Sequence, residues 1–142
     1  MSDEQTSAAE RSEMYRRGDE ARTRVMGPGG AARRARMRAV HPDLERHLIE
    51  NAWGQVNARP GLDVRTRELI TVGILLALGR EREAAGHIGG ALNVGVTRDE
   101  LVELLIHCTA YAGFPTMVTG VELLAQALEA RGELAPAEGS SS

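Results

Sequence analysis

Apolar side chains recur at helical spacing along most of this chain, and no segment alternates apolar and polar residues as a half-buried strand would. The clearest case runs from Val64 to about Leu78, where Leu, Ile and Val side chains lie nearly all round the helix, as in a buried helix. Aromatic residues make up only 3% of the 142 residues, so the core must be aliphatic. The pattern predicts a single-domain, all-α fold.

Capping and turn residues predict where the helices begin and end. Asp43 and Asp63 stand where a carboxylate caps a helix N-terminus, and Thr97 with Glu100 has the spacing of a capping box. Gly95 is placed for a left-handed C-terminal cap. The expected helices cover residues 15–26, 43–58, 64–78, 81–93 and 98–112, and a last one that follows residues 113–115 and ends near residue 132.

Both ends of the sequence are polar and poor in large apolar groups. Such segments cannot bury enough apolar surface to fold on their own. We therefore expect disordered tails at residues 1–12 and 132–142, with one helical domain over residues 13–131.

Several absences limit the chemistry. All 17 basic residues are arginine, which excludes a lysine Schiff base and a P-loop. Serine occurs only in the two end segments, so a serine nucleophile in the folded body is excluded as well. The single Cys108 cannot form an intramolecular disulfide, and its mid-helix position favours a small core residue over a reactive thiol.

The charge and hydropathy patterns indicate which binding partners and which cellular location to expect. The formal net charge is −3, and the arginine-rich stretch over residues 33–38 has no interleaved aromatics, so we expect a solvated or subunit-packing face and no nucleic acid. No apolar run approaches the length of a membrane span, and the N-terminus lacks the apolar region of a signal peptide. These features predict a cytoplasmic protein with no membrane partner.

Glu83 and His87 are the first candidate pair, because residues four apart share one face of a helix. A carboxylate next to an imidazole raises its pKa and orients it for proton transfer near pH 7. The spacing fits equally a surface pair that only stabilises the helix.

Glu68 is the first polar interruption inside the most apolar helix. A buried carboxylate must be paired or protonated, so Glu68 is a candidate acid or base. The alternative is a salt bridge with Arg65 or Arg67, or an exposed carboxylate in the first turn. Glu68, Glu83 and His87 do not have the usual spacing of a metal-binding triad, so we expect no metal.

Glu103, His107 and Tyr111 form a polar stripe at positions i, i+4 and i+8 of an otherwise apolar helix. Such a stripe either lines a pocket or contacts a neighbouring subunit. We favour the subunit contact, because a small all-α chain with an apolar helix usually buries that helix in an oligomer.

Three motifs closely resemble the carboxymuconolactone decarboxylase family: AWGQVNARPGLDVRTR from Ala52, HIGGALNVGVTRDE from His87, and YAGFP from Tyr111. The likeness runs from about Tyr15 to Arg131. It implies an all-helical fold, subunits assembled as trimers or hexamers, and cofactor-free decarboxylation of a lactone acid for the name-giving enzyme. The thiol peroxidase branch of the superfamily has a CxxC where this chain has Arg80 and Glu83, so that function is not expected.

Two positions depart from the decarboxylase pattern. The family usually has an Arg two residues after the His, where this chain has Gly89, and an Asn three residues after the Pro, where it has Val118. Arginine can clamp a carboxylate with two hydrogen bonds. Its absence suggests a more apolar and roomier pocket.

The resemblance implies a mechanism by general acid catalysis. We expect His87, held by Glu83, to donate the proton, with Arg80 or His107 near the developing negative charge and Glu68 orienting them. A small-molecule substrate would be bound by residues that differ in type but cluster in the matched motifs: Arg80, His107, Tyr111, Trp53 and Val118.

Two other functions stay open at this point. One is an enzyme of the same fold that acts on a larger aromatic or polyketide intermediate, by decarboxylation, proton transfer or ring rearrangement. The other is a non-catalytic ligand-binding or assembly subunit, in which His87 need not titrate abnormally.

Overall fold

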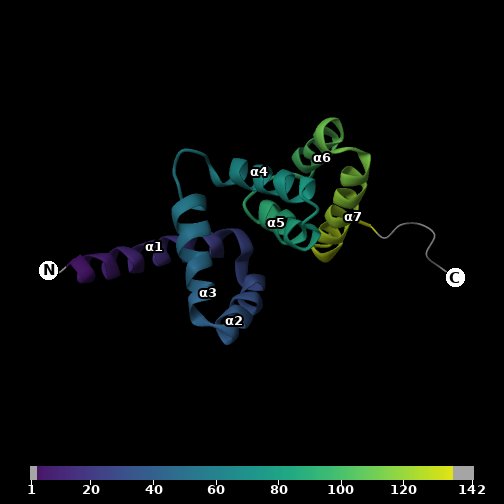
Figure 1. Ribbon diagram of the computed structural model, residues 1–142. Coiled ribbons are helices and arrows are strands. Elements are labelled where there is room, and N and C mark those ends of the chain that lie inside the picture. The colour runs from purple at the N-terminus through teal and green to yellow at the C-terminus, as the bar shows by residue number, and fades with distance from the viewer. Residues whose placement is uncertain (1–2, 136–142) are drawn as a thin grey trace. The chain divides into compact units, whose positions relative to one another are not determined.

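The structure is a computed structural model that describes residues 3–135, with side chains from residue 13 onward. All regular structure in this part of the chain is helical (Figure 1), which confirms the predicted all-α fold. Two of the elements are not α-helices: η1 is a 3-10 helix and η2 is a π-helix. In chain order the elements are α1 (Asp3–Met26), η1 (Gly27–Gly30), α2 (Ala31–Val40), α3 (Pro42–His47), η2 (Leu48–Asn57), α4 (Val64–Ala77), α5 (Glu81–Asn93), α6 (Arg98–Ala112) and α7 (Phe114–Ala130).

The chain divides into two compact units, an N-terminal unit (Met1–Arg67) and a C-terminal unit (Glu68–Ser142). The boundary falls inside α4, so this helix belongs to both. Within the described residues, no helix is long and apolar enough to cross a membrane.

Helix α1 begins at Asp3, so the backbone of residues 3–12, which we expected in a disordered tail, is helical. This stretch contains Glu, Gln and Ala, all strong helix formers. Residues 136–142 of the expected C-terminal tail lie outside the described residues.

In the N-terminal unit, α1 packs against η2 at two glycines. A Cβ on Gly18 would overlap the carbonyl oxygen of Ile49, and a Cβ on Gly54 would overlap the carbonyl oxygen of Met14. The backbones of the two helices therefore touch, which only glycine permits. Ile49 and Trp53 are buried on the same helix, at 0% and 4% exposure.

The N-cap of α3 is His41 and not Asp43 as predicted. His41 has an extended backbone, with φ of −163°, and its Nδ1 accepts a hydrogen bond from the Asp43 N–H at 3.1 Å. Pro42 occupies the first helical position, where its fixed φ suits the helix and its missing N–H leaves no bond unmade. Asp43 is thereby placed in the first turn, 2.7 Å from Arg46.

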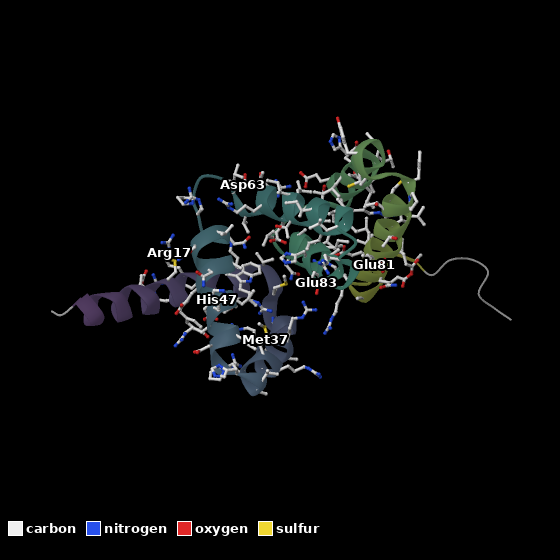
Figure 2. The ribbon with its side chains drawn as sticks, viewed as in Figure 1. Arg17, Met37, His47, Asp63, Glu81 and Glu83 are labelled. Atoms are coloured by element: carbon white, nitrogen blue, oxygen red, sulfur yellow. The ribbon has the colours of Figure 1, made fainter. Side chains whose placement is uncertain are left out.

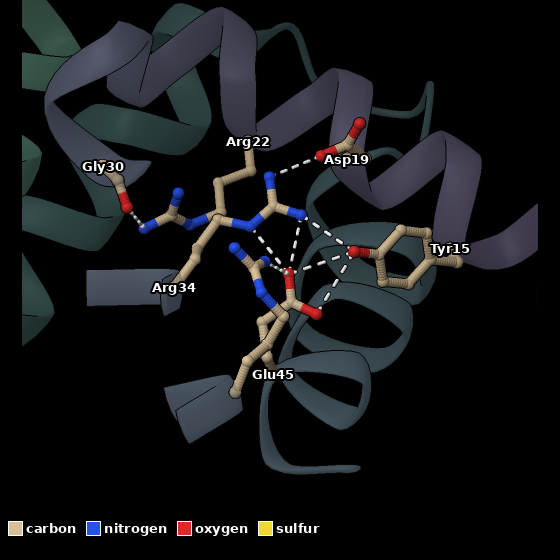
Figure 3. Close-up of polar contacts among 7 residues, drawn as sticks. Tyr15, Asp19, Arg22, Gly30, Arg34 and Glu45 are labelled. Carbon is tan, nitrogen blue, oxygen red and sulfur yellow. Dashed lines mark hydrogen bonds and ion pairs between the residues drawn. The ribbon is translucent and has the colours of Figure 1, made fainter. Parts of the chain in front are cut away.

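Polar contacts hold α2, which contains no buried residue (Figure 3). The Glu45 carboxylate on α3 is 2% exposed and accepts hydrogen bonds from Arg34 Nε at 2.7 Å, Arg38 Nη1 at 3.2 Å and the Tyr15 hydroxyl at 3.1 Å. Arg34 also donates to Asp19 on α1. Burial, followed by the bond to Glu45, raises the pKa of Tyr15.

In the C-terminal unit, α4 to α7 enclose an aliphatic core. Helix α7 packs against both α5 and α6. The core side chains come from all four helices and one turn: Val72, Leu76, Ala84, Ile88, Ala91, Val96, Leu101, Leu105, Leu124 and Leu128.

The prediction that α4 is buried nearly all round is wrong for the single chain. Val72 and Leu76 are buried, but Ile70 and Ile74 on another side of the helix are 47% and 52% exposed. One face of α4 supplies the core, and none of the described elements of the C-terminal unit covers Ile70 and Ile74 on the other.

Local signals set the starts of α4 and α6 and the end of α5 as predicted, whereas α7 already begins at Phe114, inside the predicted break at residues 113–115. Asp63 Oδ1 accepts from the Thr66 N–H at 2.7 Å, which confirms the cap of α4. Gly95 has φ of +92°, as expected for a left-handed cap. Both hydrogen bonds of the capping box between Thr97 and Glu100 are present, at 3.1 and 2.8 Å.

Replacing Thr97 by Ala should lower the free energy of unfolding by about 1 kcal/mol, since it removes an N-cap acceptor. Urea denaturation monitored by circular dichroism measures the change. Thr109→Ala on the same helix is the control, because the Thr109 hydroxyl donates to the Ile106 carbonyl inside the helix and caps nothing. Equal midpoints for the two variants would contradict the role of the cap.

Candidate active site

Glu68 and His87 form a close pair inside the C-terminal unit. Glu68 shares one face of α4 with Val72 and Leu76, at i, i+4 and i+8, and this face contributes to the core. His87 lies on α5 next to Ile88, which is 1% exposed. The packing of α4 on α5 therefore brings together two residues that are 19 positions apart.

The contact is a hydrogen bond of 2.8 Å between His87 Nδ1 and Glu68 Oε2. The Glu68 side chain is 1% exposed, whereas the His87 side chain is 17% exposed. The second carboxylate oxygen, Glu68 Oε1, is buried and has no hydrogen-bond partner among the described residues. The carboxylate is thus enclosed, while part of the imidazole faces outward.

This contact bears on which ring nitrogen of His87 can exchange a proton with a substrate. With Glu68 ionised, its carboxylate only accepts hydrogen bonds, so Nδ1 carries the hydrogen of this contact. The proton that can be exchanged then belongs to Nε2.

The carboxylate that contacts Nδ1 is therefore Glu68, the role that helical spacing had assigned to Glu83. Glu83 is an exposed residue in the first turn of α5 (Figure 2). Arg80 is the N-cap residue of α5 and is exposed as well. Sequence reasoning proposed both Glu68 and His87 but did not pair them directly.

The polar stripe on α6 lies on the surface. Glu103 and His107 line an open depression of about 570 Å³ between α4 and α6, together with the apolar Ile70 and Ile74. Tyr111 is 84% exposed, and its ring centroid lies 5.3 Å from that of His107. Glu103 and His107 therefore line a depression, whereas Tyr111 does not, and the favoured alternative of a subunit contact stays a prediction.

Cys108 lines the same depression and is half-buried. Burial raises the pKa of its thiol, so the thiol is protonated near neutral pH. This agrees with the prediction of an unreactive cysteine, although the side chain is not fully in the core.

The other two predicted substrate-binding residues differ in exposure. Trp53 is buried in the N-terminal unit, whereas Val118 on α7 is 61% exposed. No group of three or more His, Cys, Asp or Glu side chains that could hold a metal ion is found in the part of the chain that the structure describes.

One signal in the sequence could have identified the pair. Glu68 is in phase with Val72 and Leu76, so it points to the buried face of α4 and away from solvent. A carboxylate on a buried face needs a partner on the neighbouring helix, and His87 is the histidine of that helix.

Comparisons with known proteins match the part of the sequence that contains Glu68 and His87. A sequence model of the carboxymuconolactone decarboxylase family matches residues 42–126, which include Glu68 and His87. The chain is 44% identical over 102 residues to the 4-carboxymuconolactone decarboxylase of Acinetobacter baylyi, covering 71% of this chain and 76% of that one.

Two further relatives are more distant. The nitrosuccinic acid decarboxylase of Metarhizium robertsii is 39% identical over 71 residues, which cover 50% of each chain. An uncharacterized 15.0 kDa protein of Paracoccus denitrificans is 29% identical over 89 residues, covering 61% of this chain and 66% of that one.

Proposed function

The chain belongs to the carboxymuconolactone decarboxylase family, and on that basis we propose that it is a carboxy-lyase in which His87 donates the proton that replaces CO₂. The observation that carries the proposal is the 2.8 Å contact between His87 Nδ1 and the buried Glu68. It supplies one positioned acid, which is what the chemistry requires of a side chain.

The names of two relatives suggest a class of substrate. Nitrosuccinic acid has a nitro group on the carbon next to a carboxyl group. In a carboxymuconolactone, a carbon–carbon double bond can conjugate the reacting carbon with the lactone carbonyl. We infer that the substrate is an acid with an electron-accepting oxygen group conjugated to the carbon that loses CO₂.

The step balances without an oxidant or a reductant. The bond between the carbon skeleton and the carboxylate breaks, CO₂ leaves, and the electron pair is delocalised onto a carbonyl or nitro oxygen. A proton from His87 Nε2 then forms a C–H bond, and the neutral imidazole regains a proton from solvent. Because the electron pair is stabilised within the substrate, the proposed reaction uses no cofactor.

Glu68 is a positioning residue in this scheme. It accepts the Nδ1 hydrogen and so keeps Nε2 directed at the substrate. We propose Arg80 for the developing negative charge, and Tyr111 and Val118 as further substrate contacts. His107 and Trp53 are assigned no contact here, because His107 lines the side of α4 that carries Ile70 and Ile74, and Trp53 is buried in the N-terminal unit. Glu83 is assigned no contact with the substrate.

Several exposed apolar side chains of the C-terminal unit support assembly into a homo-oligomer, which we propose to be a trimer or a hexamer. Large apolar residues on α4, α6 and α7 and in the turn after α4 are between 38% and 68% exposed: Ile70, Ile74, Leu78, Val102, Ile106, Phe114, Val118 and Val121. Apolar surface on this scale usually marks an interface. Light scattering coupled to size-exclusion chromatography gives the mass in solution. We also propose a cytoplasmic location.

Gly89 provides a test of the substrate. The variant Gly89→Arg restores the residue that the family usually has two positions after the histidine, and a Cβ at Gly89 would meet nothing within 4 Å. We expect wild type to turn over 4-carboxymuconolactone and Gly89→Arg to lower KM about tenfold, since a guanidinium can clamp a carboxylate. Loss of substrate absorbance and release of CO₂ measure the rate.

Gly86→Arg is the matched control for this prediction. Gly86 lies on the same helix, and a Cβ there would also meet no atom within 4 Å. The variant therefore adds the same positive charge at a position where the family does not usually have an arginine. An equal fall in KM for both variants would show a general effect of charge. If neither wild type nor Gly89→Arg turns over the lactone while both stay folded, the lactone is not the substrate.

That last outcome favours the second candidate, an enzyme of the same family that acts on a larger and less acidic molecule. The observation behind it is the pair of departures at Gly89 and Val118, which replace a charged and a polar residue by glycine and an apolar side chain. The proton transfer by His87 would be unchanged, and only the substrate would differ.

A further inference from the structure

Arg22 is a buried cation in the N-terminal unit, far in sequence from the proposed active site. It lies on α1 and is 6% exposed. Its guanidinium lies directly against the backbone of Gly30, because a Cβ on Gly30 would be 2.6 Å from Arg22 Nη1 and 3.1 Å from Cζ. Arg22 Nη2 donates a hydrogen bond to the Gly30 carbonyl oxygen, at 3.3 Å (Figure 3).

This hydrogen bond engages only one of the N–H donors of the Arg22 guanidinium. A guanidinium has five N–H donors, and a neutral carbonyl at 3.3 Å is a long partner for one of them. No carboxylate is paired with Arg22 among the described residues, although every other buried or half-buried charge of this cluster has one.

The neighbouring carboxylates already accept hydrogen bonds from other residues. Glu45 accepts from Arg34, Arg38 and Tyr15, and Asp19 accepts from Arg34. Arg34 therefore pairs directly with both carboxylates, whereas Arg22 receives only their longer-range attraction, and the three arginines of the cluster outnumber its two carboxylates.

The electrostatics agree with this geometry. Burial lowers the pKa of Arg22, and the positive charges of Arg34 and Arg33 lower it further. Arginine nevertheless stays protonated in proteins. A guanidinium largely withdrawn from water without a paired counter-charge is unfavourable, so a counter-ion is expected.

We propose that the Arg22 guanidinium is the receptor of a small oxyanion bound in the N-terminal unit, beside Gly30 and the start of α2. The chemistry that fits is a carboxylate or phosphate group, which can accept two parallel N–H bonds from one guanidinium. Gly30 has no side chain, so the guanidinium can lie directly against its α-carbon. This proposal is independent of the decarboxylase reaction.

The test compares the full-length wild type with Arg22→Met and Arg24→Met. Arg24 is the matched control, because it is an exposed arginine two positions along the same helix. The melting temperature of each protein is measured against increasing inorganic phosphate, or increasing succinate, with chloride added to keep the ionic strength at about 0.15 M. Isothermal titration calorimetry with phosphate and with succinate gives the affinities.

We expect saturable stabilisation of wild type and of Arg24→Met, and at least a tenfold weaker affinity in Arg22→Met. In chloride alone, Arg22→Met should melt at or above the temperature of wild type, because it removes a buried unpaired charge. The order should reverse at saturating phosphate or succinate. Whichever anion binds more tightly identifies the group as a phosphate or a carboxylate.

Two results would overturn the proposal. If Arg22→Met is destabilised by the same amount with and without the oxyanions, Arg22 only holds the Gly30 carbonyl in place. If all three proteins respond equally to phosphate and to succinate, the effect is a general action of the salt on the fold.

Discussion

Replacing Glu68 by Gln is expected to lower kcat about 100-fold or more, with KM changed by less than about threefold. The amide of Gln can donate a hydrogen bond to Nδ1, so the neutral imidazole adopts the tautomer with its hydrogen on Nε2. A neutral ring in this tautomer is a much weaker proton donor than an imidazolium. Steady-state kinetics on the substrate identified for the wild type measures the effect.

Glu83→Gln is the matched control, since Glu83 is the exposed glutamate one helical turn before His87. We expect its kcat to stay within about twofold of wild type, because an exposed carboxylate is screened by water. A large loss in Glu83→Gln with none in Glu68→Gln would reinstate the assignment made from spacing alone. His87→Gln should lose at least as much activity as Glu68→Gln, and circular dichroism checks that each variant is folded.

Replacing Gly18 by Ala should lower the free energy of unfolding by about 3 kcal/mol or more. The new methyl group would overlap the Ile49 carbonyl oxygen and come within 2.8 Å of the Gly54 nitrogen. Both atoms belong to the backbone of η2, so no side chain can rotate out of the way. Helices α1 and η2 would have to separate, with loss of the packing around Ile49 and Trp53.

Gly86→Ala controls for the general effect of removing a helical glycine. A Cβ at Gly86 would meet no atom within 4 Å, so we expect a gain of about 0.5–1 kcal/mol from better helix propensity. Urea denaturation of both variants and wild type gives the comparison. A Gly18→Ala protein with a wild-type midpoint would refute the backbone contact between α1 and η2.

The helix ends of the C-terminal half followed from the sequence because their signals are local. Glu81–Asn93 and Arg98–Ala112 have the predicted bounds. The capping box at Thr97 and the left-handed Gly95 act within four residues of the chain, so no distant contact is needed to set them.

The cap of α3 shows where a local signal was misjudged. Asp43 is a good capping residue, but Pro42 already fits the first helical position, so the helix starts one residue earlier and His41 becomes the cap. The sequence also gave no indication that η2 would be a π-helix. Its hydrogen bonds span five residues, and the apolar spacing over residues 44–56 fits an α-helix equally well.

The sequence by itself determined the helical class, the family, and the residue types available for proton transfer. The tertiary structure decided which carboxylate serves His87, because that choice depends on two helices meeting. Helical spacing places Glu83 within reach of His87 along one helix, but packing buries Glu68 against the imidazole and leaves Glu83 exposed. A carboxylate withdrawn from water interacts with its partner far more strongly than one that water screens, and burial of this kind is set by the contact between α4 and α5.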